Sequence, residues 1–572
     1  MKFRWTLAPP QPALATHLAI QLKLSPLLAQ CLLNRGHSEL ALAEDFLSPR
    51  LKNLADPFLL PNMERAVERL LRAREHAERV VIFGDYDVDG VTSTALLLEV
   101  FRALGWQADF YLPHRLEEGY GLSQDGVENC LAKFQTRLLL AVDCGSTATA
   151  TIAWLRERGV EVLVLDHHQV SDPPPPAVAL VNPQLAPADA PSYRELCSVG
   201  LAFKLAHALL KRLREQEVGE ASDFDLRPFL DLVALGTVAD LVPLVGENRI
   251  LVSAGLERLS VTQRPGLKAL KIVAQVKDPI GVYEIGFQLA PRLNAAGRLE
   301  TAAQALHLLL ARDLHEAETI AVELDARNRE RQQIERTMAD EVIGAVRARF
   351  NPETDFAIVE GQLLWHIGVV GIVASRVLRE FYRPTIIIGG DGDEWRGSGR
   401  SIEGFDLAAA LRQCDDLLVR HGGHAMAAGL SIAPGNLDGF RERLNELAQR
   451  SLTPEMLRPV LRLDAEVALP ELTLAELAHL NQLKPTGQGN PVVNLMARSL
   501  TMKRPPQRIG KEGRHAKFQV TDGSTELEAV WWSVNDSPLP GGRFDLAFEP
   551  QLNEYNGRRM VQLKVLDWRP AQ

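Results

Sequence analysis

Short apolar runs alternate with helical stretches over residues 80–170. The runs Val80–Phe83, Leu138–Val142 and Val160–Leu165 have the length and the branched aliphatic content of buried strands. Helical patterns fill the segments between them, and we expect Thr92 or Ser93 to cap the helix that follows the first run. Strands that alternate with helices form parallel sheets, so this segment predicts an α/β domain.

The pattern changes twice after this domain. Residues 300–345 contain few helix breakers and repeat apolar side chains every four positions, which predicts a long helix connecting two lobes. Residues 346–450 predict a second α/β lobe, and the short strands after residue 450 are typical of a five-stranded OB-like barrel. We therefore predict an α/β protein with a two-lobed core, a connecting helix and a C-terminal OB-like β-barrel. Residues 1–45 are predicted to form a helical segment, whose function the sequence does not indicate. The first lobe is predicted at 46–310, the connecting helix at 311–345, the second lobe at 346–450 and the barrel domain at 451–572.

Composition narrows the class of protein. A chain of 572 residues is too long for one core, so several domains are expected. No apolar run approaches the ~20 residues that span a bilayer, and the N-terminus lacks the apolar segment of a signal peptide. The five cysteines are scattered without a Cys-x-x-Cys pair, which favours a reducing cytoplasm. The net charge of −10 argues against nucleic-acid binding by the whole surface but leaves room for a local basic patch.

Three carboxylates follow the first apolar run: Asp85, Asp87 and Asp89. Acids this close repel one another unless a cation lies among them, and a hard divalent cation prefers oxygen ligands. An EF-hand calcium loop is excluded, because its twelfth position requires Glu and here holds Leu96. For this segment taken alone, a solvated acidic turn without metal stays an alternative.

Other strand ends carry ligand-type residues as well. Asp143 ends the second run, and Asp166, His167 and His168 end the third. Ligands bind open α/β sheets at the carboxyl ends of strands, so these groups are expected to converge. Asp240 lies in an apolar run, where burial demands a partner. So many ligands exceed the need of one ion and predict two Mn²⁺ or Mg²⁺ ions, the arrangement that phosphate-ester hydrolysis uses.

The segments Gly84–Gly90, Val142–Gly145, Asp166–His168 and Gly236–Leu244 resemble the four motifs of the DHH phosphoesterase superfamily. The likeness continues through His114–Leu122, Pro291–Leu299 and Trp365–Arg376, and it is nearest to the branch of single-strand-specific 5′→3′ DNA exonucleases. It implies a catalytic Asp143 that bridges two ions and a catalytic His168 that faces the phosphate. The metal-ligand positions that it implies are Asp85, Asp87, Asp89, Asp143, His167 and Asp240.

Substrate contacts are expected in three further places. The glycine-rich segments Trp395–Ser401 and His421–Gly429 could bring backbone amides close to an anion, although tight hairpins explain them equally well. A basic segment, Lys503–Lys517, lies near Phe518, Trp531 and Trp532 and suits single-strand binding, while the tryptophans themselves are expected in the core. The substrate-binding residues that pattern and resemblance together predict are Arg115, Arg298, Ser398, Arg400, His424, Lys511 and Arg514.

The resemblance implies a metal-dependent 5′→3′ exonuclease of single-stranded DNA that serves repair and recombination, with a helicase and a single-stranded-DNA-binding protein as partners. A phosphodiesterase for short oligonucleotides or cyclic dinucleotides is the alternative with the same chemistry, but the extra barrel and the chain length suit a polymer. A non-catalytic replication scaffold would not need the repelling acids, and a pyrophosphatase would not need the barrel.

Overall fold

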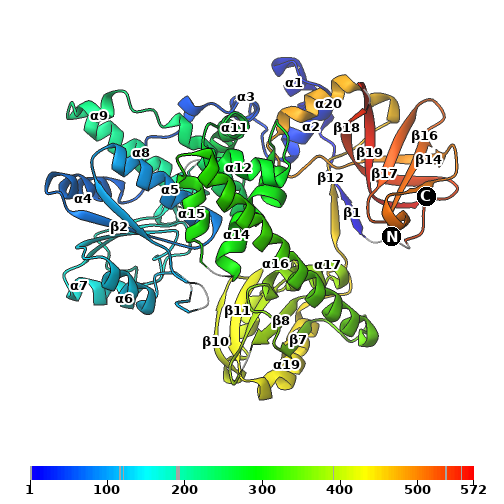
Figure 1. Ribbon diagram of the computed structural model, residues 1–572. Coiled ribbons are helices and arrows are strands. Elements are labelled where there is room, and N and C mark those ends of the chain that lie inside the picture. The colour runs from blue at the N-terminus through cyan, green and yellow to red at the C-terminus, as the bar shows by residue number, and fades with distance from the viewer. Residues whose placement is uncertain are drawn as a thin grey trace. The chain divides into compact units, whose positions relative to one another are not determined.

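The computed structural model describes residues 3–114, 117–119, 121–187, 193–299, 301–390, 392–534, 537–555 and 557–571. The chain forms two compact units. Residues 39–328 and 482–492 make the first, and residues 1–38, 329–481 and 493–572 make the second. One boundary between them falls inside the 36-residue helix α16 (Leu314–Arg349), drawn in green in Figure 1. The long helix predicted from residue 300 is thus confirmed from Leu314, after the separate helix α15 (Ala303–Leu310).

A parallel sheet forms the centre of the first unit, as predicted, and it has five strands. Gly84 pairs with Val142, and Val142 pairs with Leu165, so three strands end at the same edge. The chain segments that follow these strands therefore begin side by side. In the order β3-β2-β4-β5-β6 the strands are Gln107–Tyr111, Arg79–Gly84, Leu138–Val142, Glu161–Leu165 and Ala179–Val181.

Helices cover both faces of this sheet (Figure 1). Successive strand residues point to opposite faces, so Val80 and Ile82 of β2 pack into one core and Val81 and Phe83 into another. The first core includes α4 (Met63–Glu75), α5 (Val88–Ala103) and α8 (Ser198–Glu215). The second includes α6 (Gln124–Lys133) and α7 (Thr149–Glu157). Burial on both faces explains why the strands are continuous apolar runs.

More helices extend the first core beyond the sheet. Helix α10 (Leu230–Ala239) packs so closely on α5 that a Cβ atom on Gly236 would lie 2.4 Å from Thr92 Oγ1. Glycine at position 236 is therefore required for this contact. The other helices of this layer are α11 (Gly246–Ser260), α12 (Pro265–Ala274) and α14 (Ala290–Leu299).

The second unit contains the predicted second α/β lobe. Its sheet has the order β10-β11-β9-β8-β7, with only β7 and β8 parallel. Helix α17 (Val370–Phe381) packs against one face, and α18 (Leu407–Arg412) and α19 (Leu437–Ser451) pack against the other. The strands are β7 (Ile358–Leu363), β8 (Thr385–Gly390), β9 (Trp395–Arg400), β10 (Leu418–Gly423) and β11 (Ala427–Ile432).

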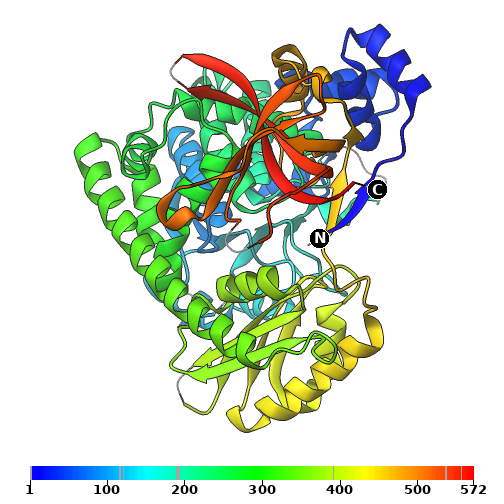
Figure 2. The same ribbon diagram turned by 90° about the vertical axis from the view of Figure 1, so that its right-hand side faces the viewer.

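The C-terminal strands form the predicted five-stranded barrel. Strands β14, β18, β19, β17 and β16 pair successively, and β16 pairs again with β14, which closes the ring. The long hairpin of β18 and β19 is drawn in red in Figure 2. In that ring order the strands are Leu495–Met502, Phe544–Tyr555, Arg558–Pro570, Glu526–Trp531 and His515–Thr521, and β13 (Ala465–Glu466) and β15 (Gln507–Ile509) extend the sheet.

The N-terminal segment belongs with this C-terminal region. Strand β1 (Arg4–Leu7) pairs in parallel with β12 (Val460–Leu463). Asn34 and Arg35, at the end of α2 (Pro26–Asn34), both bond to Asp464. The first residues of the chain thus have a structural role that the sequence did not indicate. Among the described residues, no helix has the length and apolar character needed to cross a membrane.

Candidate metal centre

The first three acids lie in the tight connection between β2 and α5. Asp87 is the N-cap of α5, and its carboxylate accepts hydrogen bonds from the amides of Asp89 and Gly90. The predicted cap at Thr92 or Ser93 is wrong, because the helix begins four residues earlier, at Val88. A Cβ atom on Gly90 would lie 2.5 Å from the carbonyl oxygen of Asp85, so only glycine permits this turn. Asp85 and Asp89 are both buried as a result.

The first residues of α8 donate hydrogen bonds to two of the acids. Asp89 accepts hydrogen bonds from the amides of Ser198 and Val199 at 2.7 and 2.8 Å, and Ser198 Oγ donates to Asp143 Oδ1 at 2.8 Å. Helix N-termini favour negative charge, which offsets part of the cost of burying these acids. Asp143 itself lies in the left-handed region, with φ of 63°, directly after β4. This conformation turns the chain sharply at the end of the strand.

The two histidines follow β5, and Asp166 positions the second. The Asp166 carboxylate accepts hydrogen bonds from the amides of Ser146 and His167, and it bonds His168 Nδ1 at 2.7 Å. The fully buried Asn182 donates to Ser146 Oγ and to the carbonyl oxygen of His168. This network fixes the loop that carries both imidazoles.

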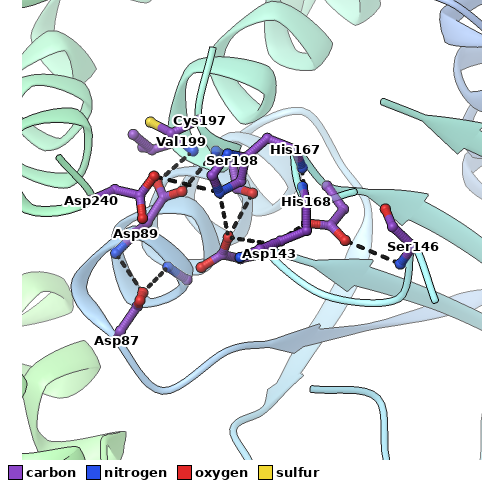
Figure 3. Close-up of polar contacts among 12 residues, drawn as sticks. Asp87, Asp89, Asp143, Ser146, His167, His168, Cys197, Ser198, Val199 and Asp240 are labelled. Carbon is purple, nitrogen blue, oxygen red and sulfur yellow. Dashed lines mark hydrogen bonds and ion pairs between the residues drawn. The ribbon is translucent and has the colours of Figure 1, made fainter. Parts of the chain in front are cut away.

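Asp240 reaches the same place from the C-terminal end of α10. His167 Nε2 lies 3.4 Å from Asp240 Oδ2 and 3.5 Å from Asp143 Oδ1. Figure 3 shows Asp89, Asp143, Asp240, His167 and His168 gathered around one point from separate elements. The structure thus brings together the six predicted metal ligands and His168.

Their ligand atoms form three groups, each with all atoms within 4.8 Å of one another. Asp143 belongs to two of them, one with Asp85 and Asp87 and one with His167 and His168. Asp143 is therefore positioned as a carboxylate shared between two ions would be. The third group joins Asp89 and Asp240 to Cys197. Burial raises the pKa of that thiol, and a protonated soft ligand is unsuited to Mn²⁺ or Mg²⁺.

Burial disfavours the charged form of these acids and so raises their pKa values. Desolvation, followed by the charge of Asp87, raises the pKa of Asp89 to about 7. Desolvation, followed by the charges of Asp89 and Asp87, raises the pKa of Asp240 to about 9. The pKa of Asp143 is also raised well above its ordinary value, by desolvation and then by Asp89. Divalent cations among these carboxylates would reverse the repulsion.

The two histidines are held in different protonation states. Desolvation, and then the neighbouring His168, lowers the pKa of His167 to about 4, so its ring is neutral and able to bind metal at pH 7. Desolvation also opposes a charge on His168, but the bond to Asp166 outweighs it and raises the pKa of His168 to about 9. His168 is therefore a charged donor at neutral pH.

The donor set fits divalent cations. His167 Nε2 and Asp240 Oδ2 are buried atoms that have no hydrogen-bond partner among the described residues. The two atoms lie 3.4 Å apart. Buried polar atoms normally have partners, and a cation with oxygen and imidazole ligands would satisfy both. Asp85, Asp87, Asp89, Asp143, His167 and Asp240 could hold Mn²⁺ or Mg²⁺ here.

The glycine-rich segments of the second unit are strands and a hairpin, one of the two alternatives for them. Residues 395–400 form β9, and the second segment forms the turn between β10 and β11, with His424 exposed in it. Arg400 Nη1 donates to Ser398 Oγ at 3.0 Å. A Cβ atom on Gly371, in the first turn of α17, would lie 3.0 Å from Ser398 Oγ and 3.1 Å from Arg400 Nη2. Ser398 and Arg400 therefore lie beside the positive end of α17.

The remaining residues predicted to bind substrate lie in different parts of the chain. Arg298 is in the last turn of α14, where Gly297 lies against the carbonyl oxygen of Tyr86 in the β2–α5 connection. Arg115 lies outside the described residues, as does the side chain of Lys511. Arg514 pairs with Glu512.

The basic segment of the barrel is less positive than its sequence suggested. Lys503 pairs with Glu526, and Lys517 pairs with Glu528, both on the neighbouring β17. The prediction of core tryptophans is wrong for Trp532, which is 49% exposed. Its ring lies 4.9 Å from that of His515. An exposed aromatic next to basic residues suits base stacking.

Sequence reasoning missed Ser198, Ser146 and Asn182. Each is buried and binds a residue of the centre or its support through a contact distant in sequence. Ser198 and Asp143, for example, are 55 positions apart. The only local signal was a serine at the start of an apolar helical run.

Known proteins resemble the chain throughout. Residues 79–237 match the DHH family N-terminal domain, residues 354–450 the DHHA1 domain and residues 463–567 the RecJ OB domain. The single-stranded-DNA-specific exonuclease RecJ of Dickeya dadantii is 40% identical over 541 residues, covering 91% of this chain and 92% of that protein. The protein of that name from Bacillus subtilis is 38% identical, covering 99% of this chain and 71% of that protein. The crystal structure of RecJ in complex with Mn²⁺ from Thermus thermophilus covers this whole chain and 80% of its own, with 31% identity and a TM-score of 0.86.

Proposed function

The chain belongs to the RecJ family of single-stranded-DNA-specific exonucleases, and we propose that it hydrolyses single-stranded DNA from the 5′ end with two Mn²⁺ or Mg²⁺ ions. The observation that carries this proposal is the position of Asp143, which is shared between a ligand group with Asp85 and Asp87 and a group with the histidines, while His167 Nε2 also lies 3.4 Å from Asp240. When bound, the ions supply Lewis-acid chemistry, which makes a water molecule more acidic and offsets charge on a phosphodiester.

The protein's own groups prepare this chemistry. Ser198 and the amide of Val199 orient Asp143 and Asp89. Asp166 holds His168 by its Nδ1 atom and keeps the ring protonated, so that it can donate to a phosphate oxygen as charge develops there. Asp143 and His168 are the catalytic residues in this account.

The second unit supplies the group that distinguishes a strand end. A terminal phosphate carries more charge than an internal one, and an arginine fork next to a helix N-terminus suits it. The placement of Ser398 and Arg400 beside the first turn of α17 supports their role as the 5′-phosphate site. His424 of the same unit and, separately, Arg298 of the first unit are proposed as further contacts to the strand, as are Arg514 and Trp532 of the barrel.

The cysteines bear on the compartment in which the protein works. All five cysteines are free and buried, which supports a reducing compartment, and we assign the protein to the cytoplasm. A helicase and a single-stranded-DNA-binding protein, as suppliers and carriers of the strand, stay predictions.

Three substrates test the proposal: a linear single strand, a closed circular single strand of the same length, and a blunt duplex. With Mn²⁺ we expect only the linear single strand to be degraded. Cutting of the circle would contradict exonuclease action, because a circle has no end. Hydrolysis confined to dinucleotides would instead favour the alternative function, a phosphodiesterase for short oligonucleotides or cyclic dinucleotides.

A further inference from the structure

A cavity of about 690 Å³ lies within the first unit, at the far ends of two helices that carry metal-centre acids. Helix α5 has Asp89 in its first turn and contributes Glu99 to the cavity. Helix α10 has Asp231 in its first turn, at the cavity, and ends at Asp240. Glu99 is ten residues from Asp89, which separates the cavity from the metal centre by about 15 Å along the helix. The cavity is therefore distinct from the site described above.

The lining of this cavity is positively charged. It includes the four arginines Arg102, Arg258, Arg264 and Arg312, against the two acids Glu99 and Asp231. This balance is opposite to the net charge of the chain, which is −10. A concave surface with excess positive charge attracts anions.

Both acids are already engaged within the protein. Arg264 binds Glu99 through both Nη atoms, at 2.5 and 3.0 Å. Asp231 accepts a hydrogen bond of 2.7 Å from Thr262 and lies 3.7 Å from Arg264 Nε. By contrast, the side chains of Arg258 and Arg312 form no ion pair or hydrogen bond with the described residues. The charge of Arg258 acts on Asp225, whose pKa it helps to lower, but the lining as a whole keeps two more arginines than acids.

One buried polar atom also lacks a partner at this cavity. The side chain of Arg264 is 11% exposed, and its Nε atom has no hydrogen-bond partner in the described part of the chain. The nearest acceptor, Asp231 Oδ2, lies 3.7 Å away, so a closer acceptor from a ligand would stabilise this N–H. A ligand with anionic oxygens in this cavity would supply such an acceptor.

We propose that the cavity binds a small organic phosphate of mononucleotide size. Its volume is in the range of small-molecule sites, about 300–1,000 Å³. Arginine forks match phosphate oxygens, and Arg258, Arg312 and Arg264 would contact the phosphate. Pro228, Val261 and Pro265 form an apolar part of the lining, against which a base or sugar would pack. The proposal does not depend on the nuclease function.

Calorimetric titration of the full-length protein with dAMP tests it. The titration is run with Mn²⁺ bound and again in excess EDTA, and it is repeated with inorganic phosphate. The variant is Arg258→Ala/Arg312→Ala, and the matched control is Arg65→Ala/Arg156→Ala, which removes two exposed arginines of the same unit from α4 and α7.

In EDTA we expect dAMP to bind the wild type and the control equally, and the Arg258/Arg312 variant about tenfold more weakly. With Mn²⁺ the same binding should persist beside any binding at the metal centre. Binding of dAMP without binding of inorganic phosphate would identify a nucleotide, and binding of both would identify the phosphate as the recognised group. Absence of binding in EDTA would overturn the proposal, because the signal would then belong to the metal centre. Equal affinity in the Arg258/Arg312 variant and the control would overturn it as well.

Discussion

Ser198 Oγ lies 2.8 Å from Asp143 Oδ1 and donates a hydrogen bond to it, although 55 residues separate the two in sequence. The amide of the same serine donates to Asp89 at 2.7 Å. One residue at the start of α8 therefore orients two carboxylates that follow different strands. Partners of this kind, which bind the metal ligands and not the metal, tune affinity for the ion.

Substitution of Ser198 by alanine should weaken metal binding without preventing it. We expect the Mn²⁺ concentration for half-maximal nuclease activity to rise about tenfold or more, because loss of such a partner usually lowers metal affinity by roughly 10–100-fold. Ser93→Ala is the control, because this buried hydroxyl has no hydrogen-bond partner among the described residues. Identical Mn²⁺ dependence of Ser198→Ala and the wild type would exclude the orienting role.

The stability of the metal-free protein should depend on pH through Asp240. Desolvation, with Asp89 and Asp87, raises the pKa of Asp240 from 3.8 to about 9. The folded state therefore binds a proton that the unfolded state releases, and the resulting stability is lost as pH rises from about 4 to about 9.

The Asp240→Asn variant cannot titrate, so its advantage over the wild type in EDTA should grow across this range. We expect a difference in Tm at pH 9 of at least the 2–4 °C that about 1 kcal/mol gives in a large domain. Saturating Mn²⁺ should reverse the order, because the wild type then keeps a ligand that the variant lacks. Asp223→Asn, at an exposed position, serves as control. A pH-independent difference in EDTA would refute the raised pKa.

Trp532 should contribute to single-strand affinity by stacking. It is 49% exposed and lies against His515 on the barrel. Trp532→Ala is expected to weaken binding of an oligothymidylate by about 1–3 kcal/mol, the effect of losing one stacked base. The slope of affinity against salt should stay unchanged, since no phosphate contact is lost. Leu552→Ala removes another exposed apolar side chain of the barrel and should have no effect. Equal losses in both variants would assign the effect to general surface hydrophobicity.

Arg400 should distinguish the two kinds of 5′ end. Its guanidinium lies beside Ser398 and the first turn of α17, where an extra phosphate charge would be stabilised. We expect Arg400→Ala to reduce kcat/KM for 5′-phosphorylated strands by about tenfold to a hundredfold, or roughly 1.5–3 kcal/mol, and to affect 5′-hydroxyl strands much less. Arg396→Ala is the control, because Arg396 is an exposed residue of the same strand. An equal loss on both substrates would mean that Arg400 contacts only the strand interior.

The sequence predicted the metal centre to the extent that its signals are local. An acid that directly follows an apolar run, such as Asp85 or Asp143, reveals both the strand and the edge at which it ends. That Asp240 belongs to the metal centre could be inferred only from its apolar surroundings and from family resemblance. Ser198 and Asn182 left no such signal, because their partners are distant in sequence.

Local rules failed where several residues compete for the same role. Asp87 caps α5 in place of Thr92 or Ser93. Its carboxylate accepts a hydrogen bond from the amide of Gly90, in a turn that only glycine permits. The glycines of β9 were ambiguous for a different reason. Gly397 and Gly399 leave no room for a Cβ atom against Ile388 and Leu407, so packing requires them in a strand that composition alone would not favour.

The most direct test of the central claim follows the fate of each end of a single strand. Oligonucleotides labelled at the 5′ or the 3′ end are incubated with the wild type or Asp143→Ala, in Mn²⁺, Mg²⁺ or EDTA. For the wild type with either metal, we predict immediate release of a 5′-labelled mononucleotide, while the 3′ label remains on progressively shorter strands. We predict no release in EDTA or by Asp143→Ala, although that variant should unfold in EDTA at a temperature no lower than the wild type, since a repelled buried acid is removed. Persistent release by folded Asp143→Ala in saturating Mn²⁺, or early release of the 3′ label by the wild type, would contradict the account.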